Sequence, residues 1–553
     1  MNKKVCSFPI LFALLALLIG TCAVVFPASA QAAPISTGSI TVRGTVASSY
    51  DAYQIFSANV VDGDSDAKIA TDLAWASDAV RDAALPVLHS AGMPNSQTAA
   101  QEAAEWLNTD SHLTSALSAQ LARSLQSSGA VSVALNAGTT AELPCGYWLI
   151  VADDDAIAQG EAGTAPIMAL VGGSAVTVKP KAATPKVAKH VLEDSTAAWQ
   201  KAADATVADD LYWRLSATVP AGLTAYDTYT VRFVDTMSAG LDPSKVAASM
   251  RVYVAAGAEG GFDAVACEGG NANSTPAKGW TDITSQCKVS VEGNAFTVRT
   301  GDLVAALGGT DAFTAGARVV AVYDAPLGAN CNRGATKGNP NEVYLRYPRS
   351  PFADQSGDAG FTRTPSDDAC AYTWDLALTK RGSDGDKPLA GAVLSIADDR
   401  GRTLAADGTW DAESKATVTT GEDGRATVSG VDSGKLEVRE LKAPKGYSAF
   451  EGTRSVTVKA EGLDVDQVAA AKPKLTITAE SPLRADSADG STGSLEASLI
   501  NTPTGTPPSI TTGGFMPSTG DMAMYAAAAA AVAGAALIVV ALLVKRGGGS
   551  HKE

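Results

Sequence analysis

The sequence is poor in the residues and motifs on which most enzyme sites depend. Histidine occurs only 4 times in 553 residues and no Cys-x-x-Cys pair is present, so a zinc site is not expected. Gly-x-Ser-x-Gly, His-Glu-x-x-His and phosphate-binding glycine loops are also missing. The Asp-rich run at 62–66 begins like a calcium loop, but its twelfth position is Leu73 rather than a bidentate Glu. We therefore predict no metal, no cofactor and no enzyme activity.

Basic residues are outnumbered by acidic ones, 43 Lys plus Arg against 59 Asp plus Glu. The net charge of −16 argues against a nucleic-acid partner and favours a soluble surface that repels its own copies. The part of the chain between its two apolar ends is long enough for roughly three domains.

The first 30 residues have the three parts of a secretory signal peptide. Lys3 and Lys4 give a basic start, and an apolar run follows over residues 10–25. Ala28-Ser29-Ala30 then supplies a small-residue cleavage site. Cys22 leaves a lipoprotein as a second interpretation. Either way, we expect the chain to be exported.

A second apolar run lies close to the C-terminal end. Residues 522–544 are rich in Ala, Val and Leu and carry no charge. This run is long enough for one helix across the hydrocarbon core. Lys545 and Arg546 follow at once, and positive residues stay on the cytoplasmic side. We predict a transmembrane helix at 522–544 and a cytoplasmic tail at 545–553.

A five-residue motif, Met516-Pro517-Ser518-Thr519-Gly520, stands directly before this apolar run. It resembles the Leu-Pro-x-Thr-Gly sorting signal of sortases, with Met in the place of Leu. Sortases are cysteine transpeptidases, so the resemblance implies cleavage between Thr519 and Gly520 and transfer of the Thr519 carboxyl to an amine. Pro517 presets an extended backbone that suits an enzyme groove.

The exported part has the pattern of a mainly β protein. Apolar and polar residues alternate from Ile40 and Val42, and further strands are expected at 131–135 and 147–151. Between them, apolar residues recur at helical spacing, which predicts helices inserted into the first β-domain. These residues are Leu73, Trp75, Val80, Leu85, Leu88, Ala103, Trp106, Leu113, Leu117, Leu121 and Leu125.

Composition marks the boundaries of the predicted domains. Residues 179–186 are rich in Pro, Ala and Lys and have little to bury, as expected of a linker. We predict a first domain at 31–178, a middle domain at 187–371 and a third domain at 372–503. The Pro-, Thr- and Gly-rich stretch 504–515 is expected to be a stalk.

Five cysteines follow the predicted signal peptide. Cys267 with Cys287, and Cys331 with Cys370, could close disulfides in an exported protein. Cys145 would then be left over. Free buried thiols at some or all of these positions are the alternative.

The third predicted domain carries the most specific pattern. A strand at 376–380 is followed by Pro-Leu-Ala-Gly-Ala at 388–392, and residues 436–447 read Leu-Glu-Val-Arg-Glu-Leu-Lys-Ala-Pro-Lys-Gly-Tyr. These segments resemble the isopeptide-forming, Leu-Pro-x-Thr-Gly-anchored major pilins of the SpaA-like and SpaH/EbpB-like families. The resemblance implies tandem immunoglobulin-like β-sandwiches, the last of them a collagen-adhesin B-type domain.

The same resemblance assigns an internal cross-link to the third domain. Lys380 would form an isopeptide bond with Asn501, and Glu440 would catalyse the reaction. A Lys in an apolar interior is driven towards its neutral, nucleophilic amine, and a nearby buried carboxyl towards its protonated form. Folding would hold the amine and the amide together at a high effective concentration.

The middle domain resembles the same pilins in three short segments. Lys189 lies in an opening strand, Asp235 ends the segment Val-Arg-Phe-Val-Asp, and Asn341 lies in a closing strand. The resemblance implies a Lys189–Asn341 bond with Asp235 as catalyst. Asn339 is the nearest rival for Asn341.

Assembly into a fibre needs one exposed amine on each subunit. Residues 176–181, Val-Thr-Val-Lys-Pro-Lys, match parts of the family's acceptor motif, although Lys179 stands where that motif has Tyr. The resemblance implies Lys181 as the acceptor, with Lys179 and Lys186 as alternatives. A link from Thr519 of one subunit to Lys181 of the next does not close on itself, so repetition gives a fibre.

Together these features indicate a secreted backbone pilin, anchored in the membrane before sorting and then attached to the cell wall, that supports adhesion. The implied partners are a sortase, other copies of the chain and peptidoglycan, with minor pilins and host surface ligands as further partners. A monomeric wall-anchored adhesin, or a minor tip or base pilin, is the main alternative. A surface hydrolase would require an unrecognised site within residues 31–175.

Overall fold

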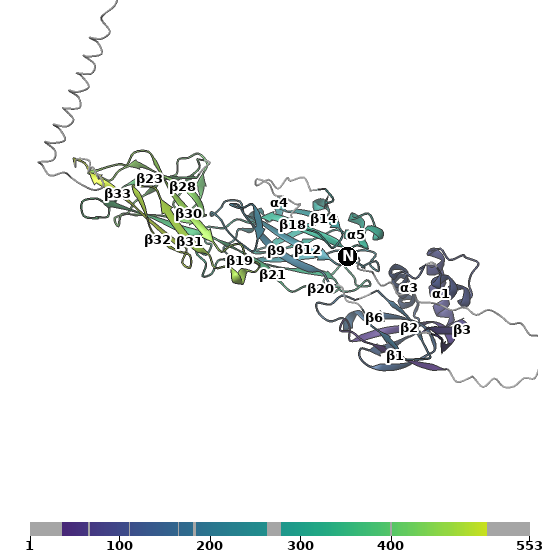
Figure 1. The fold of residues 1–553 in the computed structure, drawn as a ribbon. Helices are drawn as coiled ribbons and strands as arrows, with labels where there is room; N and C mark the ends of the chain where they lie inside the picture. The colour runs from purple at the N-terminus through teal and green to yellow at the C-terminus, as the bar shows by residue number, and fades with distance from the viewer. Residues whose placement is uncertain are drawn as a thin grey trace, which may run out of the picture.

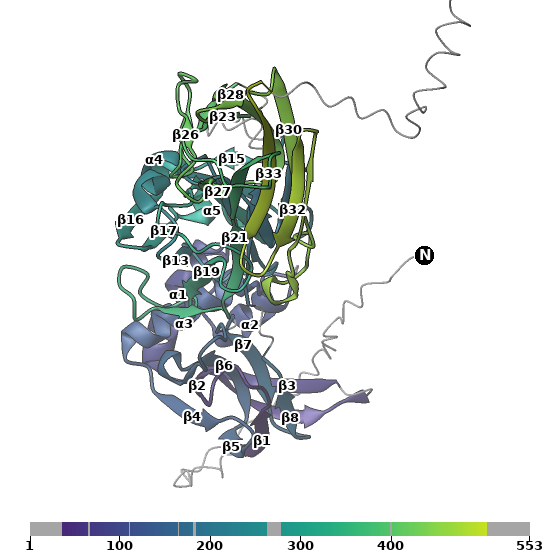
Figure 2. The same ribbon diagram turned by 90° about the vertical axis from the view of Figure 1, so that its left-hand side faces the viewer.

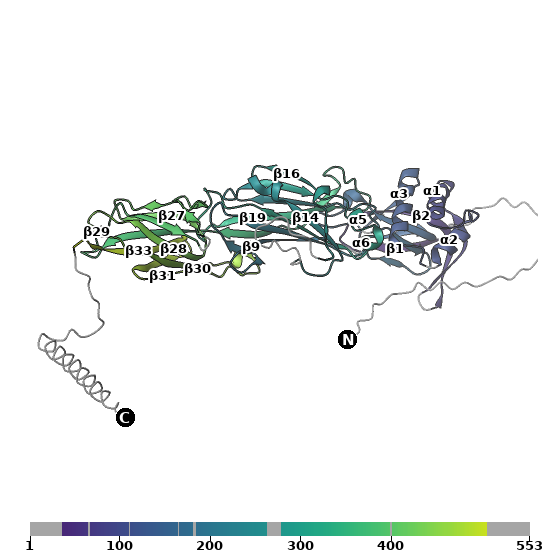
Figure 3. The same cartoon turned by 90° about the horizontal axis from the view of Figure 1, so that it is seen from above.

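The computed structural model describes residues 36–64, 67–109, 111–163, 165–180, 184–262, 278–398 and 401–505. The protein is mainly β, with 45% strand and 13% helix, which confirms the predicted class. The sheets form three bodies that follow one another in chain order along an elongated molecule (Figures 1 and 3). We call them the first, middle and third modules, and their strands lie within 37–178, 186–372 and 374–503.

The first module combines two sheets with three helices. Its strands are β1 (Thr37–Val42), β2 (Ser49–Asp62), β3 (Lys68–Trp75), β4 (Ser132–Asn136), β5 (Thr140–Pro144), β6 (Gly146–Ala152), β7 (Ile167–Val171) and β8 (Val176–Val178). The small sheet has the order β5-β1-β8. The larger one has the order β3-β2-β6-β7, and β4 also pairs with β2.

The three inserted helices are α1 (Asp78–Ser90), α2 (Ala100–Asn108) and α3 (Ser115–Ser128). Each of the two longer ones begins at a hydroxyl cap, since Ser77 accepts from the Val80 N–H and Thr114 from the Leu117 N–H. Gly129, at a φ of 73°, ends α3 in the left-handed conformation that glycine adopts without strain. The apolar sides of the helices pack on β2 and β6, above the larger sheet in Figure 2.

The predicted helical pattern fails at its beginning. Leu73 and Trp75 lie on β3, which pairs antiparallel with β2, and the Trp75 ring packs on Phe56 with 4.8 Å between ring centroids. The 14-residue strand β2 offers a long edge that needs a hydrogen-bonding partner, and this pairing outweighs the helical spacing. Leu113 lies in the connection before α3 rather than inside a helix.

The middle module is a sandwich of two sheets. Its strands are β9 (Lys186–Glu193), β10 (Ala198–Gln200), β11 (Ala202–Asp204), β12 (Tyr212–Val219), β13 (Arg232–Met237), β14 (Arg251–Ala256), β15 (Thr281–Asp282), β16 (Lys288–Glu292), β17 (Ala295–Arg299), β18 (Ala317–Asp324), β19 (Asn339–Pro348), β20 (Phe361–Arg363) and β21 (Asp367–Tyr372), with short helices α4 (Val246–Ser249), α5 (Leu303–Ala306) and α6 (Thr310–Phe313). One sheet has the order β10-β9-β12-β18-β14-β15, and the other has the order β11-β21-β19-β13-β17-β16 with β20 paired to β19. A large apolar core fills the space between them.

The third module is also a two-sheet sandwich. Its strands are β22 (Trp374–Gly382), β23 (Val393–Ala397), β24 (Thr403–Leu404), β25 (Trp410–Asp411), β26 (Val418–Thr419), β27 (Arg425–Val431), β28 (Gly434–Lys442), β29 (Tyr447–Ser448), β30 (Thr453–Glu461), β31 (Lys474–Ala479), β32 (Leu483–Asp489) and β33 (Ser494–Pro503). One sheet has the order β27-β22-β33-β29 with β32 paired to β33. The other has the order β25-β24-β23-β28-β30-β31 with β26 paired to β23.

Several predicted features lie outside the described residues: the signal peptide at 1–30, Lys181, the sorting motif at 516–520 and the apolar run at 522–544. Among the residues that are described, no helix is long and apolar enough to cross a membrane.

The middle and third modules meet at a cluster of buried acidic residues. Asp204, at the end of β11, accepts hydrogen bonds from the Trp374 indole N–H at 2.6 Å and from the Ser433 N–H at 3.0 Å. Glu193 Oε2 accepts from the Asp204 N–H at 3.1 Å. Burial, and then the charge of Asp204, raises the pKa of Glu193 to about 7, while burial raises that of Asp432 well above its usual value.

We expect this junction to loosen as the pH rises from 5 to 8. The pKa of Glu193 in the folded protein, about 7, lies above its ordinary 4.5, so the stability that it contributes is complete below pH 4.5 and is lost as the pH passes 7. Its neighbours Asp194, Asp204 and Asp432 are all acidic, and their negative charges oppose the ionisation of Glu193, as burial does. Thermal unfolding should show a midpoint several degrees lower at pH 8 than at pH 5.

The matched control for this prediction is an exposed glutamate of the same module. E193Q should reduce the difference between the two pH values, whereas E292Q should leave it unchanged, because Glu292 is exposed on β16. An equal pH response in the parent and in E193Q would contradict the assignment.

Candidate functional site

The middle module holds a lysine that has no access to solvent. Lys189 lies on β9, where Lys189, Val191 and Glu193 point inwards and alternate with partly exposed residues. Its Nζ lies over the rings of Trp213 and Tyr323, 5.5 and 5.4 Å from their centroids. The aromatic faces attract the cation but do not replace its water, so a carboxylate partner is needed.

That carboxylate comes from the opposite sheet. Asp235 on β13 and Asn341 on β19 lie on neighbouring antiparallel strands of one sheet, whereas Lys189 belongs to the other. All three side chains are fully buried. Lys189 Nζ is in direct contact with Asp235 Oδ2. Strand register therefore brings together the lysine, acid and asparagine that the sequence predicted.

A tyrosine hydroxyl connects these three groups. Tyr323, on β18, accepts hydrogen bonds from Lys189 Nζ at 2.8 Å and from Asn341 Nδ2 at 2.8 Å. It donates to Asp235 Oδ2 at 3.2 Å. The sequence gives no sign of this role, because Tyr323 lies in an apolar strand and has the same pattern there as an ordinary core aromatic.

Burial controls the protonation of the middle cluster. Desolvation lowers the pKa of Lys189 to about 8, against the opposing effect of Asp235, and it raises the pKa of Asp235. Both shifts favour the neutral forms, an amine and a carboxylic acid. A neutral amine beside a carboxamide is the arrangement that nucleophilic acyl transfer requires.

The third module contains a second cluster with direct contacts between all three groups. Lys380 Nζ lies 2.5 Å from Asn501 Oδ1 and 2.8 Å from Glu440 Oε1. Asn501 Nδ2 donates to the two Glu440 oxygens at 2.9 and 3.2 Å. All three residues are buried. The Glu440 carboxylate therefore touches both the amine and the amide nitrogen.

Strand pairing places this second cluster. Lys380 lies on β22 and Asn501 on β33, which run parallel side by side, with Lys380 opposite Leu499. Glu440 reaches them from β28 in the facing sheet, and its Oε2 also accepts from the Phe450 N–H at 3.0 Å. Desolvation lowers the pKa of Lys380 to about 8, in spite of Glu440.

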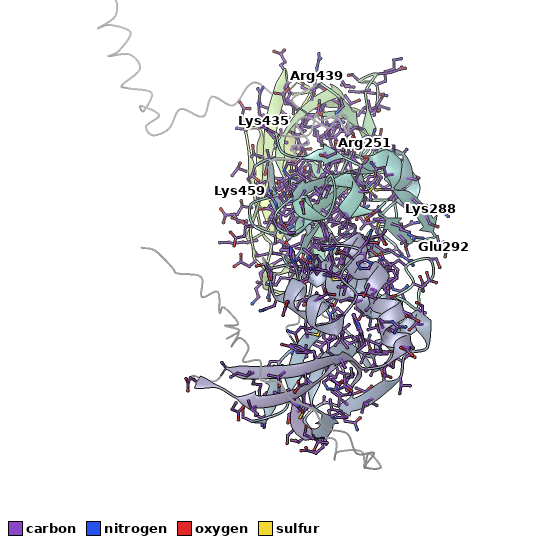
Figure 4. The ribbon with its side chains drawn as sticks, turned by 90° about the vertical axis from the view of Figure 1, so that its right-hand side faces the viewer. Arg251, Lys288, Glu292, Lys435, Arg439 and Lys459 are labelled. Atoms are coloured by element: carbon purple, nitrogen blue, oxygen red, sulfur yellow. The ribbon has the colours of Figure 1, made fainter. Side chains whose placement is uncertain are left out.

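Ordinary lysines of the same modules are arranged differently. Lys435 and Lys459, labelled in Figure 4 with Arg439, Arg251, Lys288 and Glu292, lie on the outer surface. There they pair with Glu437 and Glu461 at 3.2 and 2.6 Å, fully in reach of water. Lys189 and Lys380 therefore differ from these surface lysines in their surroundings, since each is buried against an acid and shares a cluster with an asparagine.

The other residues predicted for the site have separate places. Asn339 is buried, but its side chain bonds to the Asn332 backbone and to Ala371 O rather than to Lys189. Lys179 and Lys186 are exposed at the two ends of the predicted linker.

The cysteines are free thiols at all four described positions, Cys145, Cys287, Cys331 and Cys370. The predicted Cys331–Cys370 bridge is therefore wrong. Cys331 Sγ contacts the Arg333 guanidinium, while Cys370 Sγ bonds within its own strand to Ala371 O at 3.7 Å. Cys267, the predicted partner of Cys287, lies outside the described residues.

Comparison with known proteins defines the class of the third module first. Residues 375–472 match the family model described as SpaA: Prealbumin-like fold domain. The third module therefore contains a SpaA prealbumin-like domain, and the predicted SpaA-like resemblance is confirmed. The match includes Lys380 and Glu440 and ends before Asn501.

Particular relatives follow from the same comparison. The trypsin-resistant surface T6 protein of Streptococcus pyogenes serotype M6 is 32% identical over 129 residues, and the match spans only 22% of each protein's length. Among solved structures, the T6 backbone pilin of that organism has a TM-score of 0.45 at 17% identity, covering 85% of this chain and 98% of its own. The major pilin SpaD of Corynebacterium diphtheriae has a TM-score of 0.42 at 15% identity, with the same coverage.

The lowered pKa of Lys380 predicts an unusual pH response in N501A, which keeps the lysine but lacks the amide. Because the folded pKa of about 8 lies below the ordinary 10.5, burial of the charged amine destabilises the fold below pH 8, and this cost disappears as the pH rises to 10.5. We expect the free energy of unfolding of N501A to rise by roughly 2 kcal/mol between pH 7.5 and 10. Chemical denaturation would measure it.

The control for this prediction is the double variant K380M/N501A, which has no amine at the site. It should lack the increase, although all other titrating groups are unchanged. If both variants respond alike, the increase does not come from Lys380.

Proposed function

We propose that this protein is the structural backbone subunit of a pilus that a sortase assembles on the cell surface. The observation that carries the proposal is the presence of a buried Lys–acid–Asn cluster in each of two successive modules. A subunit that transmits pulling force benefits from such clusters, because each can become a covalent cross-link. The SpaA prealbumin-like domain and the T6 surface protein relative support the same function.

The chemistry of the third module follows from its contacts. The neutral Lys380 amine attacks Cγ of Asn501, and a new Nζ–Cγ amide bond forms. Glu440 touches both nitrogens, so it can take a proton from Nζ and give one to Nδ2. The Cγ–Nδ2 bond then breaks, and its electron pair leaves with ammonia. In the middle module, Lys189 would attack Asn341 and form the same kind of amide bond, with Asp235 in contact with the amine.

The bond in the third module would join its first strand to its last. Lys380 on β22 and Asn501 on β33 are 121 residues apart in the chain. Closing a loop of that length stabilises a fold by about 5 kcal/mol through the entropy of the unfolded chain. A force that enters at one end of the module would pass through the bond and bypass most of the sheet.

Assembly between subunits would use the two ends of the exported chain. A sortase would cleave after Thr519 and hold its carboxyl as a thioester, and the Lys181 amine of another subunit would then attack. The product is a covalent head-to-tail fibre, and the last subunit would be joined to peptidoglycan. The chain would be exported and held in the membrane until it is sorted, and it would have no enzyme activity beyond its own cross-linking.

A monomeric wall-anchored adhesin, or a minor tip or base pilin, is the second candidate function. The sorting motif and the two buried clusters would serve these proteins equally well. The difference is Lys181, because a protein that does not extend the fibre needs no acceptor lysine.

The internal bonds predict a change in mass. The exported protein should weigh less than its processed sequence by two ammonia molecules, one for each cluster. K189A and K380A should each restore one ammonia, and the double variant should restore both. Intact-mass spectrometry measures this directly. A parent protein with the full calculated mass would remove the internal cross-links from the proposal.

The intersubunit bond predicts a ladder of covalent multimers of this protein. Cell-wall extracts on a denaturing gel should show high-mass species that react with antibody against this protein, and K181A should abolish them. K186A serves as the matched control, because Lys186 is an exposed lysine only five positions away. A single band in the parent strain would favour the adhesin. Loss of the ladder in K186A, but not in K181A, would identify Lys186 as the acceptor lysine.

A further inference from the structure

The two clusters differ in how the acid reaches the amide. In the third module Glu440 contacts the Asn501 amide nitrogen directly, at 2.9 and 3.2 Å. In the middle module Asn341 Nδ2 bonds to the Tyr323 hydroxyl instead, and this hydroxyl bonds to Asp235. Aspartate is one methylene shorter than glutamate, and the tyrosine oxygen occupies the position that bridges the gap.

The Tyr323 oxygen also lies between the two nitrogens that must exchange a proton. It is 2.8 Å from Lys189 Nζ and 2.8 Å from Asn341 Nδ2. With two bonds accepted and one donated, the hydroxyl is fully used by the reacting groups. Asp235 Oδ1 and Asn341 Oδ1, by contrast, have no hydrogen-bond partner among the described residues.

We infer that Tyr323 is a catalytic residue of Lys189–Asn341 bond formation, passing a proton from the attacking amine to the leaving amide nitrogen. This inference rests on the proposed function, since it assigns a role within the same cross-linking reaction. The third module needs no such residue, because Glu440 alone contacts both nitrogens.

The proton balance of the step is complete without any other reactant. Lys189 Nζ attacks Cγ of Asn341 and gains positive charge, while the carbonyl oxygen gains negative charge. Nζ gives one proton to the Tyr323 oxygen, whose own hydrogen turns from Asp235 to Nδ2. The Cγ–Nδ2 bond breaks as the carbonyl re-forms, and ammonia leaves with the electron pair. Tyr323 and Asp235 end with as many protons as they had at the start.

The surroundings of Tyr323 favour a hydroxyl that passes a proton on over a phenolate that acts as a general base. Burial raises the pKa of its phenol well above the usual value, so the hydroxyl keeps its proton at neutral pH. A protonated Asp235 would place a donor on Oδ1, in the same cluster as the unpartnered carbonyl oxygen of Asn341. Such a donor would stabilise the negative charge that develops on the carbonyl oxygen.

A packing role is the alternative, and Y323F separates the two. The Tyr323 ring packs on Phe296 at 4.8 Å between centroids and lies under Lys189 Nζ. Phenylalanine keeps both ring contacts and removes only the hydroxyl. Y226F is the matched control, since Tyr226 is buried in the same core with a hydroxyl that bonds to none of the cluster groups.

The experiment follows both cross-links in the same full-length chains. After pulse labelling of the expressing cells, the linked Lys189–Asn341 and Lys380–Asn501 peptides are quantified by mass spectrometry at successive times. We expect Y323F to slow the first link at least tenfold, since general acid–base catalysis contributes about 10²-fold or more. The second link should form at the parent rate and serves as an internal clock. Y226F should change neither.

A rescue variant tests the reason for the tyrosine. In D235E/Y323F the longer acid should reach the amide nitrogen as Glu440 does, and the first link should form faster than in Y323F alone. If Y323F destabilises the middle module, as limited proteolysis would reveal, fluorotyrosine placed at position 323 changes the acidity of the phenol while it keeps the packing.

Each outcome has one meaning. An unchanged rate of the first link in a folded Y323F chain, or in the fluorotyrosine chain, overturns the role of Tyr323 and leaves the proposed function intact. Absence of both links in the parent would overturn the proposed function itself.

Discussion

The cost of removing a lysine ammonium from water is the constraint to which the arrangement of both sandwich modules responds. An ion without water in a protein interior costs several kcal/mol, and an opposite charge repays this only with good geometry. Lys189 contacts Asp235 and Lys380 contacts Glu440, and each of these pairs shares its cluster with a buried asparagine. Conversion of the amine to an amide removes the ionisable group altogether, so the cross-link would resolve the constraint that the fold imposes.

The two clusters would brace their modules in different ways. In the third module the lysine and the asparagine lie on adjacent parallel strands of one sheet, so a bond there would join two neighbouring strands within that sheet. In the middle module Lys189 belongs to one sheet, and Asp235 and Asn341 belong to the other, so a bond would fasten the two layers across the core. The acid differs accordingly: Glu440 reaches across the sandwich, whereas Asp235 lies on the strand beside the asparagine and leaves room for Tyr323.

The sequence was most informative where a residue type is out of place in its pattern. A lysine at an inward position of a strand, or an asparagine in a closing strand, has few structural explanations, and the structure brings the members of each predicted set together. Tyr323 could not be found this way, because an inward aromatic is what a strand in a sandwich core normally carries. Leu73 and Trp75 were predicted to be helical and lie on a strand for a related reason. Helical spacing over a few residues does not exclude a strand when the long strand β2 is available as a pairing partner. Cysteine pairing depends on the distance between strands, which spacing along the chain does not reveal.

The junctions between modules also differ, and this bears on where the rod can bend. Between the middle and third modules only Thr373 separates β21 from β22, and Ala202 and Cys370 share an apolar core with Trp374. Between the first and middle modules the contacts include single polar ones, such as the Tyr347 hydroxyl bonded to Gly160 O at 2.8 Å and Arg123 paired with Asp227 at 2.7 Å. Apolar contacts there include Ala162 in the middle core and Phe352 against the core of the helices. A shared core resists bending because its apolar contacts must be exposed together, whereas single hydrogen bonds exchange with water at little cost. Bending of the subunit should therefore concentrate near the first boundary.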